Sequence, residues 1–251
     1  MNKAIQTNRY FLKDSLRLAI NFSLTDQNKG LPPPPLQKPY SVDKSLISLP
    51  TITSDFQFAN NSIFDVIRNR KSRRAFSDQP LALEELSFLL WATQGIRQQG
   101  DAYNALRTVP SAGCRHAFET YLVVSNIHNL APGIYRYLPI EHSLIFELEI
   151  ESTEAVVSEA TLNQSFVGKA PVTFIWSCIP YRMEWRYDLC AHRLIAIDIG
   201  HVCQNLYLAC EAIRAGTCAI GAFHQEKMDQ LIGVDGIDEF VIYLAPVGKQ
   251  R

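Results

Sequence analysis

The sequence lacks the cysteine spacing of a metal or disulfide site. Its six cysteines form no CxxC pair, and four of them lie in apolar stretches, which favours reduced, buried thiols in a cytosolic protein. His192 follows Asp188 by four residues, but a metal needs more ligands than these two and none is spaced to join them. We therefore expect no metal. The cysteines are Cys114, Cys178, Cys190, Cys203, Cys210 and Cys218.

Common phosphate-binding motifs and membrane segments are also missing. There is no GxxxxGK[ST] and no GxGxxG after a strand, which argues against a P-loop nucleotidase and a Rossmann dehydrogenase. No stretch is long and apolar enough to span a membrane, and the N-terminus lacks the apolar core and cleavage site of a signal peptide. The sequence therefore predicts a cytoplasmic protein without a membrane partner.

The composition is typical of a globular protein with a substantial core. The chain has 251 residues, of which 47% are hydrophobic and 20% are charged, so it is neither disordered nor membrane-embedded. A formal net charge of -1 and a pI near 6.6 argue against a general nucleic-acid binder.

The chain divides into an N-terminal part, residues 1–59, and a main domain, residues 60–251. Residues 9–20 are predicted to form a short helix. Residues 30–50 are predicted to be an extended arm without regular structure, because a glycine and six prolines interrupt the segment. Such an arm wraps either a partner subunit or its own body.

Apolar periodicity predicts three helices in the main domain. The first has Asn61 or Ser62 as its N-cap and leads into a cluster of cations. The second carries leucines on one face and stops at Gly95. The third covers residues 190–215, is closed by Gly216, and is apolar nearly all the way round. Such a helix belongs in the interior or in a subunit interface.

Strand patterns occupy five segments around these helices. Strands and long helices without strict βαβ alternation indicate an α+β sandwich, in which helices flank a central antiparallel or mixed sheet. The segments are 118–124, 133–137, 143–150, 172–178 and 240–245.

Five cations fall within residues 68–74, although the whole chain is nearly neutral. If this segment runs extended, side chains two apart share a face, so Arg70, Ser72 and Arg74 point the same way. Two guanidinium groups with a hydroxyl between them suit a phosphate group. A solvated charge run at a helix end is the alternative, and contact with nucleic acid is a minor one.

Three other segments are typical of ligand-binding loops. Residues 107–116 combine proline, glycine and small residues, which lets the backbone approach a flat ligand closely. Residues 218–223 follow the long helix and are small in the same way. At the C-terminus, Lys249 and Arg251 face one side of an extended tail and would enclose a phosphate monoester together with the basic cluster. The alternatives are a plain loop, a tight turn and a solvated tail.

Five motifs follow one another in the order of a known family. They are R-K-S-R-R-A-F, P-S-A-G-x-R-H, D-I-G-H-x-x-Q-N-L, A-I-G-A-F and P-V-G-K-Q-R. Over roughly residues 60–251 they resemble the nitroreductase-like flavoproteins, and among these the SagB/ThcOx-type dehydrogenase branch, whose N-terminal extension the Pro-rich arm also resembles. The resemblance implies an intertwined homodimer of α+β fold with one FMN at each end of the subunit interface.

The FMN contacts that the resemblance implies fall into three groups. The basic group would hold the phosphate and the pyrimidine edge of the flavin: Arg70, Ser72, Arg74, Lys249 and Arg251. The loop group would line the flavin from the other subunit: Pro110, Ser111, Ala112 and His116. The turn group would offer backbone contact near N5, the atom that accepts hydride: Ile220, Gly221 and Ala222. Arg68 and Arg73 are then expected to face water or the partner subunit.

The sequence departs from the family at the pair Arg186-Tyr187. A Lys-Tyr pair stands there in azoline-oxidising members of the branch and assists proton removal. Arginine stays protonated at physiological pH, so Arg186 is no general base, whereas Tyr187 is able to donate or relay a proton. The alternative is that both residues only pack, or pair with Glu184 or Asp188. Ala117 replaces the proline usual after the histidine, with little expected consequence.

The leading hypothesis is an FMN-dependent oxidoreductase of the SagB type that takes a hydride from an azoline or a related small or peptide-bound substrate, with oxygen reoxidising FMN. A second hypothesis is a reductase in which NAD(P)H reduces FMN, and FMN reduces a nitroaromatic or quinone. These two share a fold and cofactor, so motifs do not separate them. A third is a non-catalytic partner in a peptide-modifying complex that holds flavin weakly or not at all.

Overall fold

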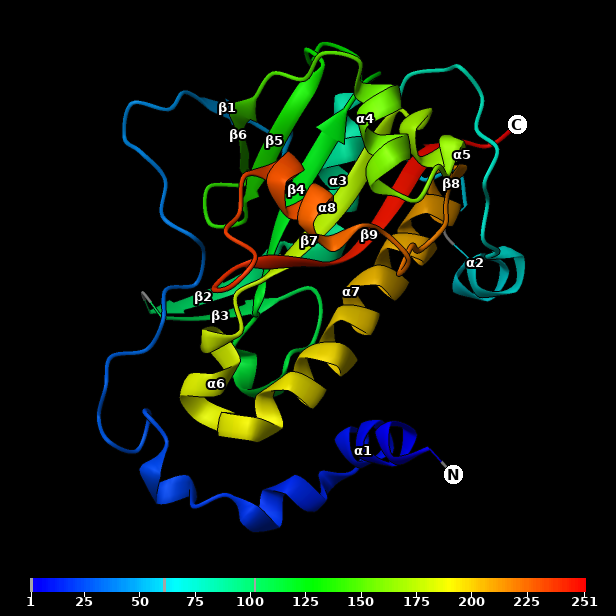
Figure 1. The fold of residues 1–251 in the computed structure, drawn as a ribbon. Coiled ribbons are helices and arrows are strands. Elements are labelled where there is room, and N and C mark those ends of the chain that lie inside the picture. The colour runs from blue at the N-terminus through cyan, green and yellow to red at the C-terminus, as the bar shows by residue number, and fades with distance from the viewer. Residues whose placement is uncertain (1, 61, 102) are drawn as a thin grey trace.

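A seven-stranded antiparallel sheet forms the centre of the molecule (Figure 1). This computed structural model describes residues 2–60, 62–101 and 103–251. The strand order across the sheet is β1-β6-β5-β4-β7-β9-β8. The strands are β1 (Leu46–Ser48), β4 (Phe118–Val124), β5 (Gly133–Leu138), β6 (Ser143–Leu148), β7 (Val172–Cys178), β8 (Ala215–Thr217) and β9 (Phe240–Lys249).

Helices cover both faces of this sheet. Successive side chains of a strand point to opposite faces, and β4 shows this clearly. Its Phe118 and Leu122 belong to the core beneath α3 (Leu83–Gln94) and α7 (Ala191–Ala212), and Tyr121 belongs to the core beneath the other helices. Those helices are α4 (Thr153–Ala160), α5 (Ser165–Gly168) and α8 (Gln225–Ile232). The predicted α+β sandwich is confirmed.

The predicted strands are present, and two of them, 118–124 and 172–178, have the predicted bounds. The prediction for the long helix was wrong at its end, because α7 stops at Ala212. The chain then reverses at Arg214, whose φ is 54°. Gly216 lies in β8 and serves packing instead: a Cβ there would lie 2.5 Å from Cδ of Arg73.

The N-terminal helix lies earlier than predicted. Helix α1 (Lys3–Phe11) is capped by Asn2, whose side chain accepts the N–H of Ala4 at 2.9 Å, and a 3-10 turn (Asp14–Ala19) replaces the second half of the predicted helix. No residue of either element is buried. This N-terminal lobe therefore projects from the body (Figure 1).

The arm of residues 30–50 wraps its own body. Buried arginines donate to its carbonyl groups: Arg107 Nη2 to Leu36 O at 2.7 Å, and Arg136 Nη1 to Lys38 O at 2.8 Å. Charge-assisted bonds of this kind anchor a segment that has few backbone partners of its own. The prediction that no regular structure forms in the arm was wrong at β1, which pairs with β6.

Several short elements were not predicted. Strands β2 (Ile96–Asp101) and β3 (Asn104–Arg107) form a separate hairpin, and α6 (Tyr181–Tyr187) precedes α7. The helix with the predicted N-cap is α2 (Ile63–Asn69); Ser62 Oγ accepts the N–H of Asp65 at 3.3 Å, while Asn61 lies outside the described residues.

All six cysteines are free thiols, five of them buried, as predicted. Among the residues that the structure describes, no helix has the length and hydropathy needed to cross a membrane, and no group of three or more His, Cys, Asp or Glu could hold a metal ion.

Candidate functional site

Helix α7 organises two groups of candidate residues on its opposite sides. Tyr207 follows Asp198 by nine positions in the chain. At about 100° and 1.5 Å per residue, their side chains leave the helix in opposite directions, roughly 13 Å apart along its axis. Between these two borders lies an exposed surface, which we call the α7 strip: Ala196, Ile197, Gly200, His201 and Gln204.

On the first border, Asp198 holds the loop of residues 110–116. The Asp198 carboxylate is 5% exposed and accepts the N–H of Ala112 at 3.0 Å. Burial raises its pKa, and hydrogen bonds from the Ser111 side chain and the Ala112 backbone partly oppose this effect. Ser111 Oγ also accepts the N–H of His116 at 3.0 Å. Polar groups that the sequence suggested for a ligand are therefore used to fix the loop, and the D-I-G-H motif supplies the anchor.

His116 lies inside the molecule and not at the loop surface. It is 3% exposed, and its Nε2 has no hydrogen-bond partner within the described residues. Burial, and then the positive charge of Arg107, lower its pKa to about 2. His116 is therefore a neutral side chain that supports the loop from behind: its backbone N–H bonds to Ser111, but its buried ring does not reach the loop surface.

The pair Arg186-Tyr187 lies directly against this loop. A Cβ at Gly113, whose φ is 57°, would lie 2.5 Å from Tyr187 Oη and 3.0 Å from Arg186 Nε, so glycine at this position lets both side chains approach the backbone closely. The suggested ion pairs of Arg186 with its acidic neighbours were wrong: Glu184 contacts His192 at 2.8 Å, and Asp188 accepts a backbone N–H. Pro110 is exposed at the same surface, and Ser111 and Ala112 are half-buried.

On the second border, the Tyr207 hydroxyl joins the basic cluster to the turn of residues 218–223. It lies 2.9 Å from Ser72 Oγ and accepts the N–H of Ala219 at 2.8 Å. The Tyr207 ring centre lies 5.3 Å from the guanidinium carbon of Arg70, a cation–π contact. Sequence reasoning missed Tyr207, although it directly follows the Q-N-L of the helix motif.

The turn beside Tyr207 exposes backbone. Ile220 is buried and donates its N–H to Leu244 O at 2.8 Å, which fixes the start of the turn. Gly221 and Ala222 are exposed, and the atom nearest to a Cβ built on Gly221 is Cε2 of Tyr243 at 3.8 Å. The backbone of these two residues is therefore open to a flat ligand.

The C-terminus brings further cations to this side of the molecule. Arg74 and Arg251 line a cavity of about 340 Å³ together with Lys169, a residue with no sequence signal of its own. Lys249 and Arg251 share a second cavity of about 470 Å³, and Lys249 forms an ion pair with Glu85. The structure thus joins Arg70 with Ser72 and Arg74 with Arg251, and it neutralises Lys249 within the chain.

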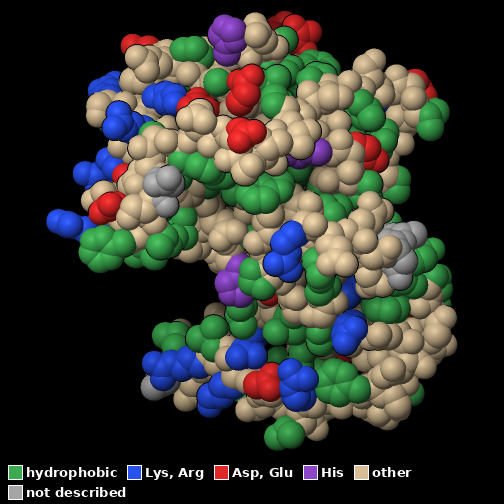
Figure 2. Space-filling model, turned by 180° about the vertical axis from the view of Figure 1, so that it is seen from behind, with side chains coloured by type: hydrophobic (Ala, Val, Ile, Leu, Met, Phe, Trp, Pro, Cys, Tyr) green, Lys and Arg blue, Asp and Glu red, His purple; other side chains and the backbone are tan. Residues whose placement is uncertain are grey.

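Arg73 corrects one expectation. It was expected to face water or a partner, but it points inward and pairs with Glu211 at 3.2 Å, because its backbone N–H donates to Thr217 O at 2.9 Å and docks the segment along β8. Within the described residues, neither Arg70 nor Arg74 forms an ion pair. Figure 2 shows Lys and Arg side chains on both sides of a hollow between the N-terminal lobe and the main body.

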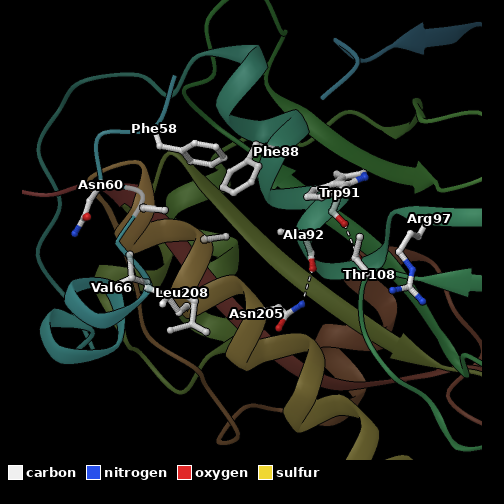
Figure 3. Close-up of a pocket in the computed structure, with 13 residues that line it drawn as sticks. Phe58, Asn60, Val66, Phe88, Trp91, Ala92, Arg97, Thr108, Asn205 and Leu208 are labelled. Atoms are coloured by element: carbon white, nitrogen blue, oxygen red, sulfur yellow. Dashed lines mark hydrogen bonds between the residues drawn. The ribbon is translucent and has the colours of Figure 1, made fainter. Parts of the chain in front are cut away.

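A further cavity of about 450 Å³ lies between α2, α3 and α7 (Figure 3). None of the predicted site residues lines it. Its walls are largely apolar, with the rings of Phe58 and Phe88 5.0 Å apart, and Asn205 donates into the wall, to Ala92 O at 2.8 Å. Ile63 of α2, which lines it, and the neighbouring Phe64 are 66% and 68% exposed.

Comparison with known proteins identifies the family. Residues 67–249 match the nitroreductase family. A protein of Methanocaldococcus jannaschii that carries a nitroreductase name is 32% identical over 186 residues, 74% of this chain and 90% of that protein. The trifolitoxin-processing protein TfxB of Rhizobium leguminosarum is 29% identical over 133 residues, which are 51% of this chain and only 35% of TfxB.

Solved structures share the fold. One from Ralstonia eutropha, which carries a nitroreductase name, has a TM-score of 0.67 at 24% identity and covers 88% of this chain and 99% of that chain. The Escherichia coli microcin synthetase McbBCD complex, solved with truncated pro-MccB17 bound, has a TM-score of 0.61 at 17% identity, over 80% of this chain and 77% of that one.

Proposed function

This chain belongs to the nitroreductase family, and we propose that it is an FMN-dependent oxidoreductase. The observation that supports this best is the pair of borders along α7: cations without ion pairs beside an open backbone turn on one side, and a loop fixed by Asp198 on the other. When bound, FMN would supply the ability to accept and donate a hydride.

The residues on the second border suit FMN by their chemistry. Arg74 and Arg251 line a cavity, and their two guanidinium groups suit a phosphate monoester; Lys169, which also lines it, pairs with Glu154 at 3.7 Å. Arg70 and Ser72, held by Tyr207, offer donors to the pyrimidine edge, and the open backbone at Gly221 leaves room for a ring system. Lys249 would contribute only by leaving Glu85.

The two borders suggest a homodimer. Within one chain, the loop of residues 110–112 and the Tyr207 group lie on opposite sides of α7, so one flavin does not reach both. A two-fold dimer that packs the α7 strips together would bring the loop of one subunit beside the cations of the other. Exposed Ile63, Phe64 and Ile67 on α2 give such an interface an apolar surface.

Arg186 and Tyr187 would then face the reacting ring from the loop side. Tyr187 is placed to donate or relay a proton, whereas Arg186, always charged, supplies positive charge only. The similarity to TfxB, a trifolitoxin-processing protein, and to the microcin synthetase complex favours a peptide-derived substrate for this chain, such as an azoline. We propose residues 60–251 as the catalytic domain, residues 1–59 as its helix and arm, and the cytoplasm as its location.

The test is the absorbance spectrum of the purified protein. We expect flavin bands near 450 nm, about where oxidised flavins absorb, and release of FMN on denaturation, identified by mass spectrometry. Colourless protein that takes up no added FMN would instead favour the non-catalytic partner. Consumption of NADH or NADPH with a nitroaromatic acceptor would favour the reductase, and no turnover with either nicotinamide would exclude that alternative.

A further inference from the structure

Arg186, at the end of α6, carries a positive charge that no acidic side chain in the described part of the chain neutralises. Its two acidic neighbours in sequence have other partners: Glu184 contacts His192 at 2.8 Å, and Asp188 accepts the N–H of Leu189 at 2.6 Å. The Arg186 side chain is half-buried, so water alone does not fully solvate the guanidinium. A partly buried cation without a counter-ion is a place where an anionic ligand gains binding energy.

The guanidinium is held in place before any ligand arrives. Its carbon lies 5.6 Å from the ring centre of Tyr187, a cation–π contact. Its Nε and Cδ also lie only 3.0 and 3.1 Å from where a Cβ of Gly113 would stand, so the side chain packs against bare backbone. A cation fixed in this way loses little conformational entropy on binding a ligand.

A second uncompensated arginine lies behind it. Arg115 is 4% exposed and meets no carboxylate among the described residues: its Nε donates to Arg182 O at 3.2 Å, its Nη2 donates to Pro34 O at 3.3 Å, and its carbon lies 4.9 Å from the Trp185 ring centre. Burial, and then the charge of Arg186, lower the pKa of Arg115. Arg182 itself is neutralised by Glu119. The surface beside the loop is therefore positive beyond the charge of one residue.

We propose that Arg186 binds a carboxylate or phosphate group of the substrate, so that this site selects anionic molecules. A planar guanidinium fork matches either group through two parallel hydrogen bonds. The inference rests on the proposed function, because it places the substrate beside the loop of residues 110–112. Arg186 is then a specificity residue, and Tyr187 remains the proton donor. The bound anion is either a group of the molecule that exchanges electrons with the flavin or the 2′-phosphate of NADPH.

The test compares matched ligands by isothermal titration calorimetry, on the full-length protein as purified and after addition of FMN. 4-Nitrobenzoate and 4-nitrobenzamide have nearly the same size, and only the first carries a carboxylate; NADPH and NADH differ by one phosphate. We expect the anionic member of at least one pair, 4-nitrobenzoate or NADPH, to bind about tenfold or more tightly than its partner. Arg186→Gln should remove that preference. Arg186→Lys should retain part of it, since lysine keeps the charge but loses the fork.

A control variant separates this effect from net charge. Lys227→Gln removes one positive charge from α8, where Lys227 pairs with Glu159 at the surface, and should leave the preference unchanged. Equal binding of both members of both pairs by the unmodified protein, or a preference that survives in Arg186→Gln, would overturn the proposal. So would a fall in oligomer mass on Arg186→Gln, because Arg186 would then pair with a second subunit. Absence of bound flavin with an intact anion preference would count against the proposed function alone.

Discussion

The two borders of the α7 strip use their polar groups in opposite ways. On the loop border, Asp198, Ser111 and the backbone of residues 112–116 bond to one another. On the cation border, Tyr207 orients Arg70 and Ser72, but Arg70 and Arg74 keep their charges free of any ion pair in the described residues. The polar groups of the loop border therefore have their partners within the chain, whereas in the proposed function those of the cation border would be completed by a ligand.

In the proposed FMN site, this difference would divide two tasks between the borders. The loop border has to hold a shape, so its hydrogen bonds are internal and its loop contains three residues of positive φ: Gly113, Cys114 and His116. Such backbone is retained only where surrounding contacts impose it. The cation border has to hold a charge, and cations that were already paired would gain less from a phosphate.

Removing charge from the cation border should have the largest effect. We expect the double variant Arg70→Ala, Arg251→Ala to bind FMN at least about 100-fold more weakly, because each hydrogen bond to a charged group contributes about 1.5–3 kcal/mol. Flavin retained after gel filtration and a fluorescence titration measure this. Arg68→Ala is the control, since Arg68 is an exposed cation of the same cluster. Undiminished FMN retention in the double variant would refute the assignment.

Replacing His116 on the loop border should change how the free energy of unfolding depends on pH. The pKa of His116 in the folded protein, about 2, lies below the ordinary value near 6.5. Its contribution to the free energy of unfolding is therefore complete above pH 6.5 and is lost as the pH falls toward 2. Because of this group, the free energy of unfolding falls by about 1.4 kcal/mol per pH unit below about 6.5. His116→Asn suits a φ of 48° and does not titrate.

Urea unfolding at pH 7 and pH 5 should therefore give a smaller difference for His116→Asn than for the unmodified protein. His142, whose pKa burial also lowers, is present in both proteins and cancels in the comparison. Equal pH dependence of the two proteins would mean that His116 becomes protonated in the folded state.

Loss of the loop anchor should be a moderate effect. Asp198→Ala leaves the Ala112 N–H without its acceptor, which costs about 1–3 kcal/mol of the free energy of unfolding. Asp198→Asn keeps an acceptor oxygen and should lose less. Hydrogen exchange at the amides of residues 111–113, with urea unfolding, measures both variants. Unchanged exchange in Asp198→Ala would show that the loop holds its shape without α7.

Tyr207→Phe should have the smallest effect. It removes the hydroxyl that joins Ser72 to Ala219 but keeps the ring beneath Arg70, so we expect a loss of about 1 kcal/mol, or about fivefold in FMN affinity. Tyr10→Phe, at an exposed tyrosine of α1, is the matched control. A change as large as that of the arginine double variant would mean that Tyr207 itself contacts the cofactor.

Local patterns predicted most of the sheet and the main helices. Strands β4 and β7 are buried on both faces and are rich in apolar, aromatic and β-branched residues, so their bounds followed from composition. Short elements with mixed composition, such as the β2–β3 hairpin, carry no such pattern. Gly216 was misread as a helix stop because its true role depends on Arg73, a residue 143 positions earlier (216 − 73).

Most residues of the candidate site were proposed from the sequence, but Tyr207, Lys169 and the interactions among all of them were not. A spacing of two residues predicted that Arg70 and Ser72 share a side, and both meet Tyr207. Nothing local indicated that Asp198 would hold Ala112, 86 residues away, or that Lys169 would join Arg74 and Arg251.

By itself, the sequence determined the fold class, the apolar strands and helices, and the motifs that point to the nitroreductase family, because these depend on side-chain periodicity and on residues close together in the chain. Only the tertiary structure decided which polar groups remain available for a ligand. Asp198 and Glu85 occupy or neutralise groups that the sequence alone offered to a cofactor, and such pairings depend on where distant segments meet. Whether a charged group is free to bind a ligand depends on which residues lie next to it in space.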